Sequence, residues 1–253
     1  MDTSTPPCAG QPRRGDALGT VFLEALAGRP GPVVVERDDG FVSVDSIEYL
    51  GGLDERDEWA VSRATGRVAD VGAGAGRAAL ALQERGQQVT AIEVSRGAAQ
   101  ACRTRGVRDV YLGTPRQAAA GGLAGGFDSA LLLGNNIGLL GSRDDAGPFL
   151  DGLGALLRPH GVIVGTAIDP YQTREPVHLE YHERNRRRGR LPGHATIRVR
   201  YQDIASDWFD WLIPSPEELA ALARPAGWQV TELRRGPGPG YAVVLRRVRP
   251  PQG

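Results

Sequence analysis

The residues best placed for chemistry lie in a glycine-rich turn in the first half of the chain. Positions 68–77 read VADVGAGAGR, so an apolar run carrying Asp70 gives way to glycines at positions 72, 74 and 76. Because glycine has no side chain, a ligand can touch the backbone at the carboxyl edge of a parallel sheet. The next apolar run ends in Glu93, about 20 residues on, where a carboxylate can hold the hydroxyl pair of a ribose. The pattern predicts a nucleoside-binding turn.

Spacing and charge separate two classes of nucleoside ligand. The dinucleotide fingerprint GxGxxG requires a glycine at position 77, which is Arg77 here. A pyrophosphate would be repelled by Asp70, whereas this carboxylate suits a ligand that has an ammonium group and no phosphates. S-adenosylmethionine (SAM) is such a ligand, and a nicotinamide-dependent oxidoreductase is disfavoured. The alternative is that the glycines only form a packing turn and that Asp70 caps a helix. That alternative would not require Glu93 at the end of the next strand.

DVGAGAGR with Glu93 resembles the first two motifs of the class I SAM-dependent methyltransferases, and the resemblance spans residues 67–248. It implies SAM as cofactor, with Asp70 and the glycine turn against its methionine part and Glu93 at its ribose. An acid usual after the third strand is missing, because Leu112-Gly113-Thr114-Pro115 stands there. The residues expected to bind the cofactor are Asp70, Gly72, Ala73, Gly74, Gly76, Glu93, Val94, Thr114 and Asn135.

The elements that position these residues follow from apolar runs that alternate with Ala-rich helical stretches, a pattern typical of βαβ units. The fold class expected is α/β, doubly wound and Rossmann-like, with a mostly parallel seven-stranded sheet whose last strand is reversed. Strands are expected at 67–71, 88–93, 108–112, 128–133, 161–167, 228–234 and 241–248. Helices are expected at 76–85, 96–105, 145–157 and 215–223. A turn at Gly161 and a flexible Gly/Ala-rich loop at 118–126 complete this part.

Two further segments are expected to cover the main fold as a small cap. Residues 1–60 contain a polar tail, a helix from Asp16 to Ala27, a hairpin at Asp39-Gly40 and a helix over 53–64. The insertion 168–214 after strand five is longer than a crossover needs, and it includes an alternating strand at 196–201. We expect both segments to form a lid over a SAM-binding domain of residues 61–253.

Methyl transfer from a sulfonium is an in-line displacement, which requires the nucleophile and the methyl group to be held close together but needs no metal. The fourth strand runs into Gly134-Asn135-Asn136, a loop expected to face the methyl group. Asn136 would orient the acceptor or simply stabilise the turn. Asp169, His178 and His182 are weak candidates for a general base. Because the two histidines lack a third ligand, no metal site is expected.

Composition limits the partners. The chain has 30 basic and 30 acidic residues, so no overall field attracts nucleic acid or an anionic membrane. No apolar run reaches 18 residues, and Cys8 and Cys102 form no metal or disulfide pattern. We therefore expect a cytoplasmic protein with a small-molecule substrate and no membrane partner; nucleic acid is disfavoured, and a homodimer is compatible with the sequence. A run of arginines is typical of a solvated helix face but would also suit an anion or RNA: Arg184, Arg186, Arg187, Arg188 and Arg190.

The sequence as a whole favours a SAM-dependent methyltransferase that acts on an oxygen, nitrogen or carbon nucleophile of a small molecule, for example a specialised metabolite. One alternative is a methyltransferase for RNA or protein, which the arginine run would serve. Another is a protein that binds SAM or S-adenosylhomocysteine (SAH) without transferring a methyl group. Several aromatic residues are expected either in the pocket or in the core: Tyr49, Tyr171, Trp208, Phe209 and Trp211.

Overall fold

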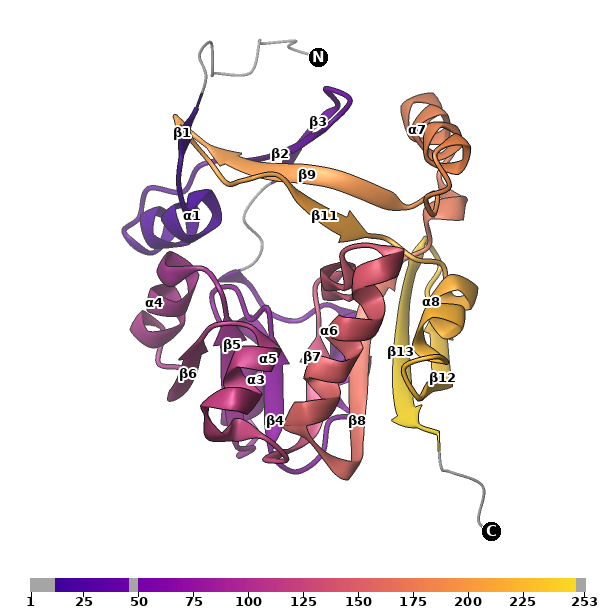
Figure 1. Ribbon diagram of the computed structural model, residues 1–253. Coiled ribbons are helices and arrows are strands. Elements are labelled where there is room, and N and C mark those ends of the chain that lie inside the picture. The colour runs from indigo at the N-terminus through magenta and orange to yellow at the C-terminus, as the bar shows by residue number, and fades with distance from the viewer. Residues whose placement is uncertain (1–11, 46–49, 249–253) are drawn as a thin grey trace.

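The computed structural model describes residues 12–45 and 50–248, so Cys8 and Tyr49 lie outside the described residues. The described chain forms a seven-stranded sheet and a separate six-stranded sheet that lies over one end of it (Figure 1). In these residues no helix combines the length and the apolar character needed to cross a membrane.

The larger sheet carries the glycine turn. Its strands are β4 (Val68–Val71), β5 (Val89–Glu93), β6 (Asp109–Leu112), β7 (Phe127–Leu132), β8 (Leu157–Ile168), β12 (Trp228–Arg235) and β13 (Gly240–Arg247). Their order is β12-β13-β8-β7-β4-β5-β6, and β13 runs antiparallel to β8. The mostly parallel sheet with a reversed last strand is therefore confirmed. Every residue of β4 and β5 is buried, because helices cover central parallel strands on both faces.

Helices on the two faces of this sheet enclose two apolar cores. They are α2 (Glu55–Val61), α3 (Arg77–Glu84), α4 (Arg96–Thr104), α5 (Pro115–Ala118), α6 (Arg143–Leu156) and α8 (Pro216–Ala223). One core lies between the sheet and α5, α6 and α8, and the other between the sheet and α2, α3 and α4. The helices expected over 53–64, 76–85, 96–105, 145–157 and 215–223 are present, with ends displaced by a few residues.

Two local predictions are wrong. The stretch 118–126 is not simply a flexible loop, because α5 continues into a π-helix over Ala119–Leu123. Thr114 opens α5 with a capping box, in which its hydroxyl accepts from the N–H of Gln117 and the Gln117 side chain accepts from the N–H of Thr114. The turn expected at Gly161 is instead an irregularity within β8, since Phe127 pairs with Leu157 whereas Ser129 pairs with Val162.

The smaller sheet joins segments that are far apart in the sequence, and we call it the cap sheet. Its strands are β1 (Arg13–Arg14), β2 (Val33–Arg37), β3 (Val42–Asp45), β9 (His194–Tyr201), β10 (Ile204–Ala205) and β11 (Phe209–Leu212). The expected hairpin and the strand expected at 196–201 are confirmed as β2–β3 and β9. β2 pairs antiparallel with β9, with Val35 opposite Val199, and β11 pairs with the other edge of β9.

Two helices flank the cap sheet: α1 (Ala17–Leu26) and α7 (Pro176–Arg187). The carboxylate of Asp16 caps α1 by accepting from the N–H of Gly19, as expected, and α1 packs on α4. α7 begins at Pro176, a residue that suits the first position of a helix. Two 3-10 helices, Asn136–Leu140 and Pro170–Gln172, follow β7 and β8. The cap sheet thus stands over the carboxyl ends of the parallel strands (Figure 1).

Candidate functional site

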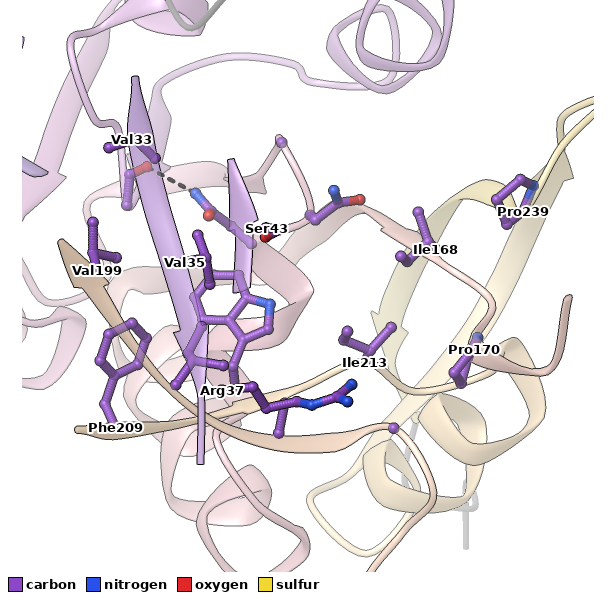
Figure 2. A pocket seen from close by; sticks show the side chains of 18 of the residues that line it. Val33, Val35, Arg37, Ser43, Ile168, Pro170, Val199, Phe209, Ile213 and Pro239 are labelled. Carbon is purple, nitrogen blue, oxygen red and sulfur yellow. Dashed lines mark hydrogen bonds between the residues drawn. The ribbon is translucent and has the colours of Figure 1, made fainter. Parts of the chain in front are cut away.

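A cavity with a volume of about 700 Å³ is lined by both the glycine turn and the cap sheet. The glycine turn contributes residues 72–75, and Asp70 lies at its base. Figure 2 shows side chains from β2 and β9, among them Val35, Arg37 and Val199, gathered around the space together with Ile213. Elements 160 residues apart in the sequence therefore meet around one space.

Backbone conformation requires the glycines of the turn. Gly72 and Gly74 have φ values of +69° and +57°, in the left-handed region that side-chain-bearing residues rarely adopt. A Cβ on Gly72 would lie 2.7 Å from Nδ2 of Asn136. This amide nitrogen donates to the carbonyls of Val71 (3.2 Å) and Gly72 (2.7 Å). Asn136 thus stabilises the turn, which is one of the two roles that the sequence left open.

Asp70 is buried beneath the turn and also lines the cavity. Its Oδ2 accepts from the N–H of Ala79 in the first turn of α3, at 3.1 Å. Burial raises the pKa of Asp70 to about 7, although the Ala79 N–H and the nearby Arg77 act in the opposite direction. A cationic group beside this carboxyl would favour its ionised form.

Glu93 supports the turn from behind and is not among the residues that line the cavity. Its Oε2 accepts from the N–H of Gly74 at 2.8 Å, and its Oε1 accepts from the N–H groups of Val94 (2.8 Å) and Ser95 (2.9 Å). Burial raises the pKa of this carboxyl, and the three N–H groups oppose that shift. The arrangement fixes the turn on the end of β5.

Three other predicted cofactor residues also lie away from the cavity lining. The side chain of Val94 is 64% exposed, and Thr114 caps α5. Gly76 begins α3 with a φ of +78°, and a Cβ there would lie 2.5 Å from the Val107 side chain. Gly76 is therefore required by the packing of α3.

Asn135 lines the cavity and has a buried side-chain oxygen, Oδ1, without a hydrogen-bond partner among the described residues. Its φ of 69° is left-handed, a conformation that Asn tolerates better than most residues. Because an unpaired buried acceptor costs free energy, the atom is suited to a donor on a bound ligand.

The structure brings the four weak catalytic candidates to the same cavity: Asn136, Asp169, His178 and His182. Asp169 accepts from the N–H of Tyr171 at 3.1 Å and forms an ion pair with Arg235 at 3.5 Å. His178 and His182 both project from α7. Burial, followed by the nearby Arg186, lowers the pKa of His182 to about 4, so this imidazole is neutral at pH 7.

Arg37 and Phe22 line the cavity and were missed by the sequence interpretation. Arg37 is 8% exposed and forms a forked ion pair with Asp39, with both N–O distances 2.8 Å. Its guanidinium lies 3.9 Å from the ring centroid of Tyr181. The sequence signal was a charge that ends the apolar run VVVER next to the hairpin turn. Phe22 had no signal beyond its place on an apolar helix face.

The aromatic residues named from the sequence divide between cavity and surface. Phe209 and Trp211 line the cavity. Tyr171 donates its hydroxyl to Glu218 at 2.6 Å, and Trp208 lies beneath Arg198, whose guanidinium carbon is 4.7 Å from a ring centroid.

Comparison with known proteins shows which proteins the chain resembles. Residues 69–164 match the family model described as a methyltransferase domain. A solved SAM-dependent methyltransferase from Bacteroides fragilis, in complex with SAH, is 27% identical; the match covers 92% of this chain and 95% of that one, with a TM-score of 0.79. The CcbJ methyltransferase from Streptomyces caelestis, 17% identical, shares the fold over 95% of this chain and 100% of its own, with a TM-score of 0.61. No curated protein matches the chain.

The residues of the cavity floor fit SAM. The turn exposes backbone at Gly72 and Gly74, where side chains would otherwise intrude. A carboxyl at Asp70 suits the ammonium group of SAM, and the unpaired Oδ1 of Asn135 suits a hydrogen-bond donor. Fold, motif and the match of residues 69–164 to a methyltransferase domain agree, and they are consistent with a class I SAM-dependent methyltransferase that has SAM as its cofactor.

Proposed function

We propose that this chain transfers the methyl group of SAM to a nucleophilic oxygen, nitrogen or carbon of a small molecule. The observation that carries the proposal is the cavity that extends from the glycine turn to the cap sheet. Its volume of about 700 Å³ lies in the range of about 300–1,000 Å³ in which proteins enclose drug-sized ligands. A cofactor on the turn and an acceptor beneath the cap sheet would share one enclosed space.

At the cofactor end, Asp70, Gly72, Ala73, Gly74 and Asn135 are the residues we assign to SAM, since each lines the cavity. SAM, when bound, supplies a methyl group activated by its sulfonium. The part of the chain is to hold donor and acceptor at reacting distance and to exclude water, which can lower such a barrier substantially.

At the acceptor end, we assign the role of a lid to the cap sheet together with α1 and α7. The inward face of this lid is mainly apolar, with Val33, Val35, Ile197 and Val199 from β2 and β9 lining the cavity. An apolar lining with a few polar groups is typical of sites for small organic ligands. Residues 61–253 without the insertion 168–214 then form the SAM-binding domain.

Three of the five arginines in the run have acidic partners, which favours a small-molecule acceptor over RNA. Arg184 pairs with Asp38 at 3.0 Å. Arg186 and Arg187 lie 3.4 Å and 3.6 Å from carboxylate oxygens of Glu183, one turn earlier on α7. These partners reduce the positive charge that the run offers to a phosphate backbone.

The function can be tested by following a radiolabelled methyl group. The purified protein is incubated with methyl-labelled SAM and a cell extract that has been separated by ultrafiltration into small molecules and macromolecules. We expect label in products of the small-molecule fraction. Label in protein or RNA alone would support the macromolecular alternative, whereas SAM binding without label in either fraction would identify a protein that binds SAM without transfer.

A Gly74→Val variant provides the matched control for this experiment. Gly74 has a φ of +57°, and a β-branched residue is strained there. Its side chain would also approach the ring of Phe22, which lies 3.4 Å from an ideal Cβ. We expect a loss of SAM binding by at least about tenfold in calorimetry, a change of about 1.4 kcal/mol, with an unchanged circular dichroism spectrum. Unaltered SAM affinity would show that the cofactor does not lie on this turn.

A further inference from the structure

The two histidines of α7 differ in their partners although both line the cavity. His178 and His182 are four residues apart, so they lie on one face of the helix. His178 also packs edge-on against Phe41, with ring centroids 4.8 Å apart. The acceptor end of the cavity therefore contains two imidazoles whose hydrogen-bonding roles can be assigned separately.

Arg37 fixes the tautomer of His178. Its Nη1 lies 3.0 Å from Nδ1 of His178, and a guanidinium only donates, so Nδ1 must be the acceptor. Burial and then the Arg37 charge lower the pKa of His178, which favours the neutral ring. In that ring the proton sits on Nε2, which becomes a hydrogen-bond donor. Arg37 is itself held by its ion pair with Asp39 and by the carbonyl of Val177, 3.2 Å from Nη2.

His182 offers a hydrogen-bond acceptor, whereas His178 offers a donor. The side chain of His182 is buried, and no hydrogen bond joins either ring nitrogen to another of the described residues. The groups that influence it are Arg186 and His178 on α7 and Arg37 on β2, all of which disfavour the imidazolium. The ring of Tyr171 lies beside it, with centroids 6.5 Å apart. A neutral imidazole always keeps one unprotonated nitrogen, and at His182 this acceptor is free.

Acidic side chains pair with the arginines that line the cavity, which bears on the charge that an acceptor can carry. The arginines that line it within the described residues are Arg37 and Arg77. Arg37 pairs with Asp39 at 2.8 Å, and Arg77 pairs with the buried Asp57 at 2.5 Å. A carboxylate or phosphate group on the acceptor would find no unpaired cation here, and its desolvation would go uncompensated.

We propose that His178 and His182 bind a hydroxyl group of an uncharged, mainly apolar acceptor as a donor and acceptor pair, and that this hydroxyl receives the methyl group. The inference rests on the proposed function. A hydroxyl oxygen can accept from Nε2–H of His178 while its own proton points to His182. As the oxygen–carbon bond forms and the carbon–sulfur bond of the donor breaks, the hydroxyl proton moves to His182 and then to solvent. A carboxylate has no proton to offer His182.

Binding to the SAH-saturated protein tests the acceptor class without turnover. The probes are 4-propylphenol, 4-propylaniline and 4-propylbenzoate, which share an apolar frame and differ in one group. We expect calorimetry to give at least about tenfold tighter binding for the phenol than for the benzoate. The benzoate cannot donate a hydrogen bond to His182, and its charge finds no unpaired cation among the described residues of the lining. Tighter binding of the benzoate or of the aniline, or no binding of the phenol, would overturn the proposal.

Variants locate the effect on the histidines. His182→Phe keeps an aromatic ring but removes the acceptor, and should weaken 4-propylphenol binding about tenfold while leaving SAH binding within about twofold. His160→Phe, at an exposed position on β8, is the matched control and should change neither. Equal phenol affinity in His182→Phe and the wild type would contradict the proposal. If the wild-type protein did not bind SAH at all, the methyltransferase function itself would be refuted.

The tautomer of His178 offers a readout that does not depend on any ligand. Nitrogen-15 NMR of the labelled protein should show the proton on Nε2 in the wild type. Arg37→Lys retains a donor to Nδ1 and should preserve this tautomer, whereas Arg37→Leu should shift the population toward Nδ1–H. A wild-type ring protonated on Nδ1, or a tautomer unaffected by Arg37→Leu, would show that Arg37 does not set the donor.

Discussion

The Asp70 side chain both supports the fold and faces the cavity. Its carboxyl is 3% exposed, accepts from the backbone of α3 and still borders the cavity. Burial raises its pKa from 3.8 in a model compound to about 7. The cofactor-free folded protein consequently retains a proton at pH values where the unfolded chain has lost it, so Asp70 links stability to pH.

This linkage has a definite sign. Because the folded-state pKa is raised, the stabilisation from Asp70 is present below about pH 4 and is lost as the pH rises through about 7. Asp70→Asn should remove that decline, which we expect to be on the order of 2 to 4 kcal/mol in the free energy of unfolding. Urea denaturation of both cofactor-free proteins at several pH values measures it. Asp128→Asn, at a carboxyl whose pKa the Arg67 N–H and Arg158 lower, should leave the slope above pH 5 unchanged. Parallel pH profiles for Asp70→Asn and the wild type would refute the assignment.

At the scale of elements, α1 is attached to the main fold through the N-terminus of α4. The carboxylate of Asp16 accepts from the hydroxyl of Ser95 at 2.8 Å and from the N–H of Gly97 at 2.9 Å, in addition to capping its own helix. The helices cross closely, because a Cβ on Gly97 would lie 2.7 Å from Cα of Gly19. This contact holds Phe22 against the glycine turn, so α1 closes one side of the cavity.

Removal of the Asp16 carboxylate, which joins α1 to α4, should loosen α1 without unfolding the larger sheet. Asp16→Ala deletes a helix cap and two bonds to α4, at a cost of about 1 to 2 kcal/mol. We expect amide hydrogen exchange in residues 17–26 to accelerate about tenfold, while exchange in β4 and β5 stays unchanged. Asp203→Ala, which breaks an exposed pair with Arg13, is the control and should have little effect. Unchanged exchange in α1 would mean that apolar packing alone holds the helix.

At the scale of the whole molecule, opposite charges balance both overall and locally. The net charge is zero, and the arginines of α7 pair with acids on the same helix or on the β2–β3 turn. A long-range field therefore contributes little to ligand capture.

Acceptor binding should accordingly depend weakly on ionic strength. Raising sodium chloride from about 50 to 200 mM should change the dissociation constant of 4-propylphenol by less than about threefold, since no phosphate contacts release counterions. A short single-stranded RNA measured in parallel should bind weakly throughout. Tight RNA binding that falls steeply with salt would favour a nucleic-acid substrate and contradict the proposed acceptor.

Sequence alone determined the parts of the protein that depend on local patterns. Alternating apolar runs and helical stretches predicted the larger sheet, and the turn chemistry of Asp39-Gly40 predicted the hairpin. The glycine turn and Glu93 were located because βαβ geometry forces both to one sheet edge. The capping box at Thr114 was equally local and would have revealed α5, but the glycines that follow it suggested a loop.

Only the tertiary structure decided which distant segments meet. The pairing of β2 with β9 joins residues 33–37 to residues 197–200, and no local periodicity specifies a partner at that separation. That pairing carries Arg37 to α7, where its guanidinium donates to Nδ1 of His178. It also covers the cavity above the glycine turn. The glycine turn could be located because its signal lies within one short segment, whereas the other end of the cavity depends on side chains that long-range packing alone brings together.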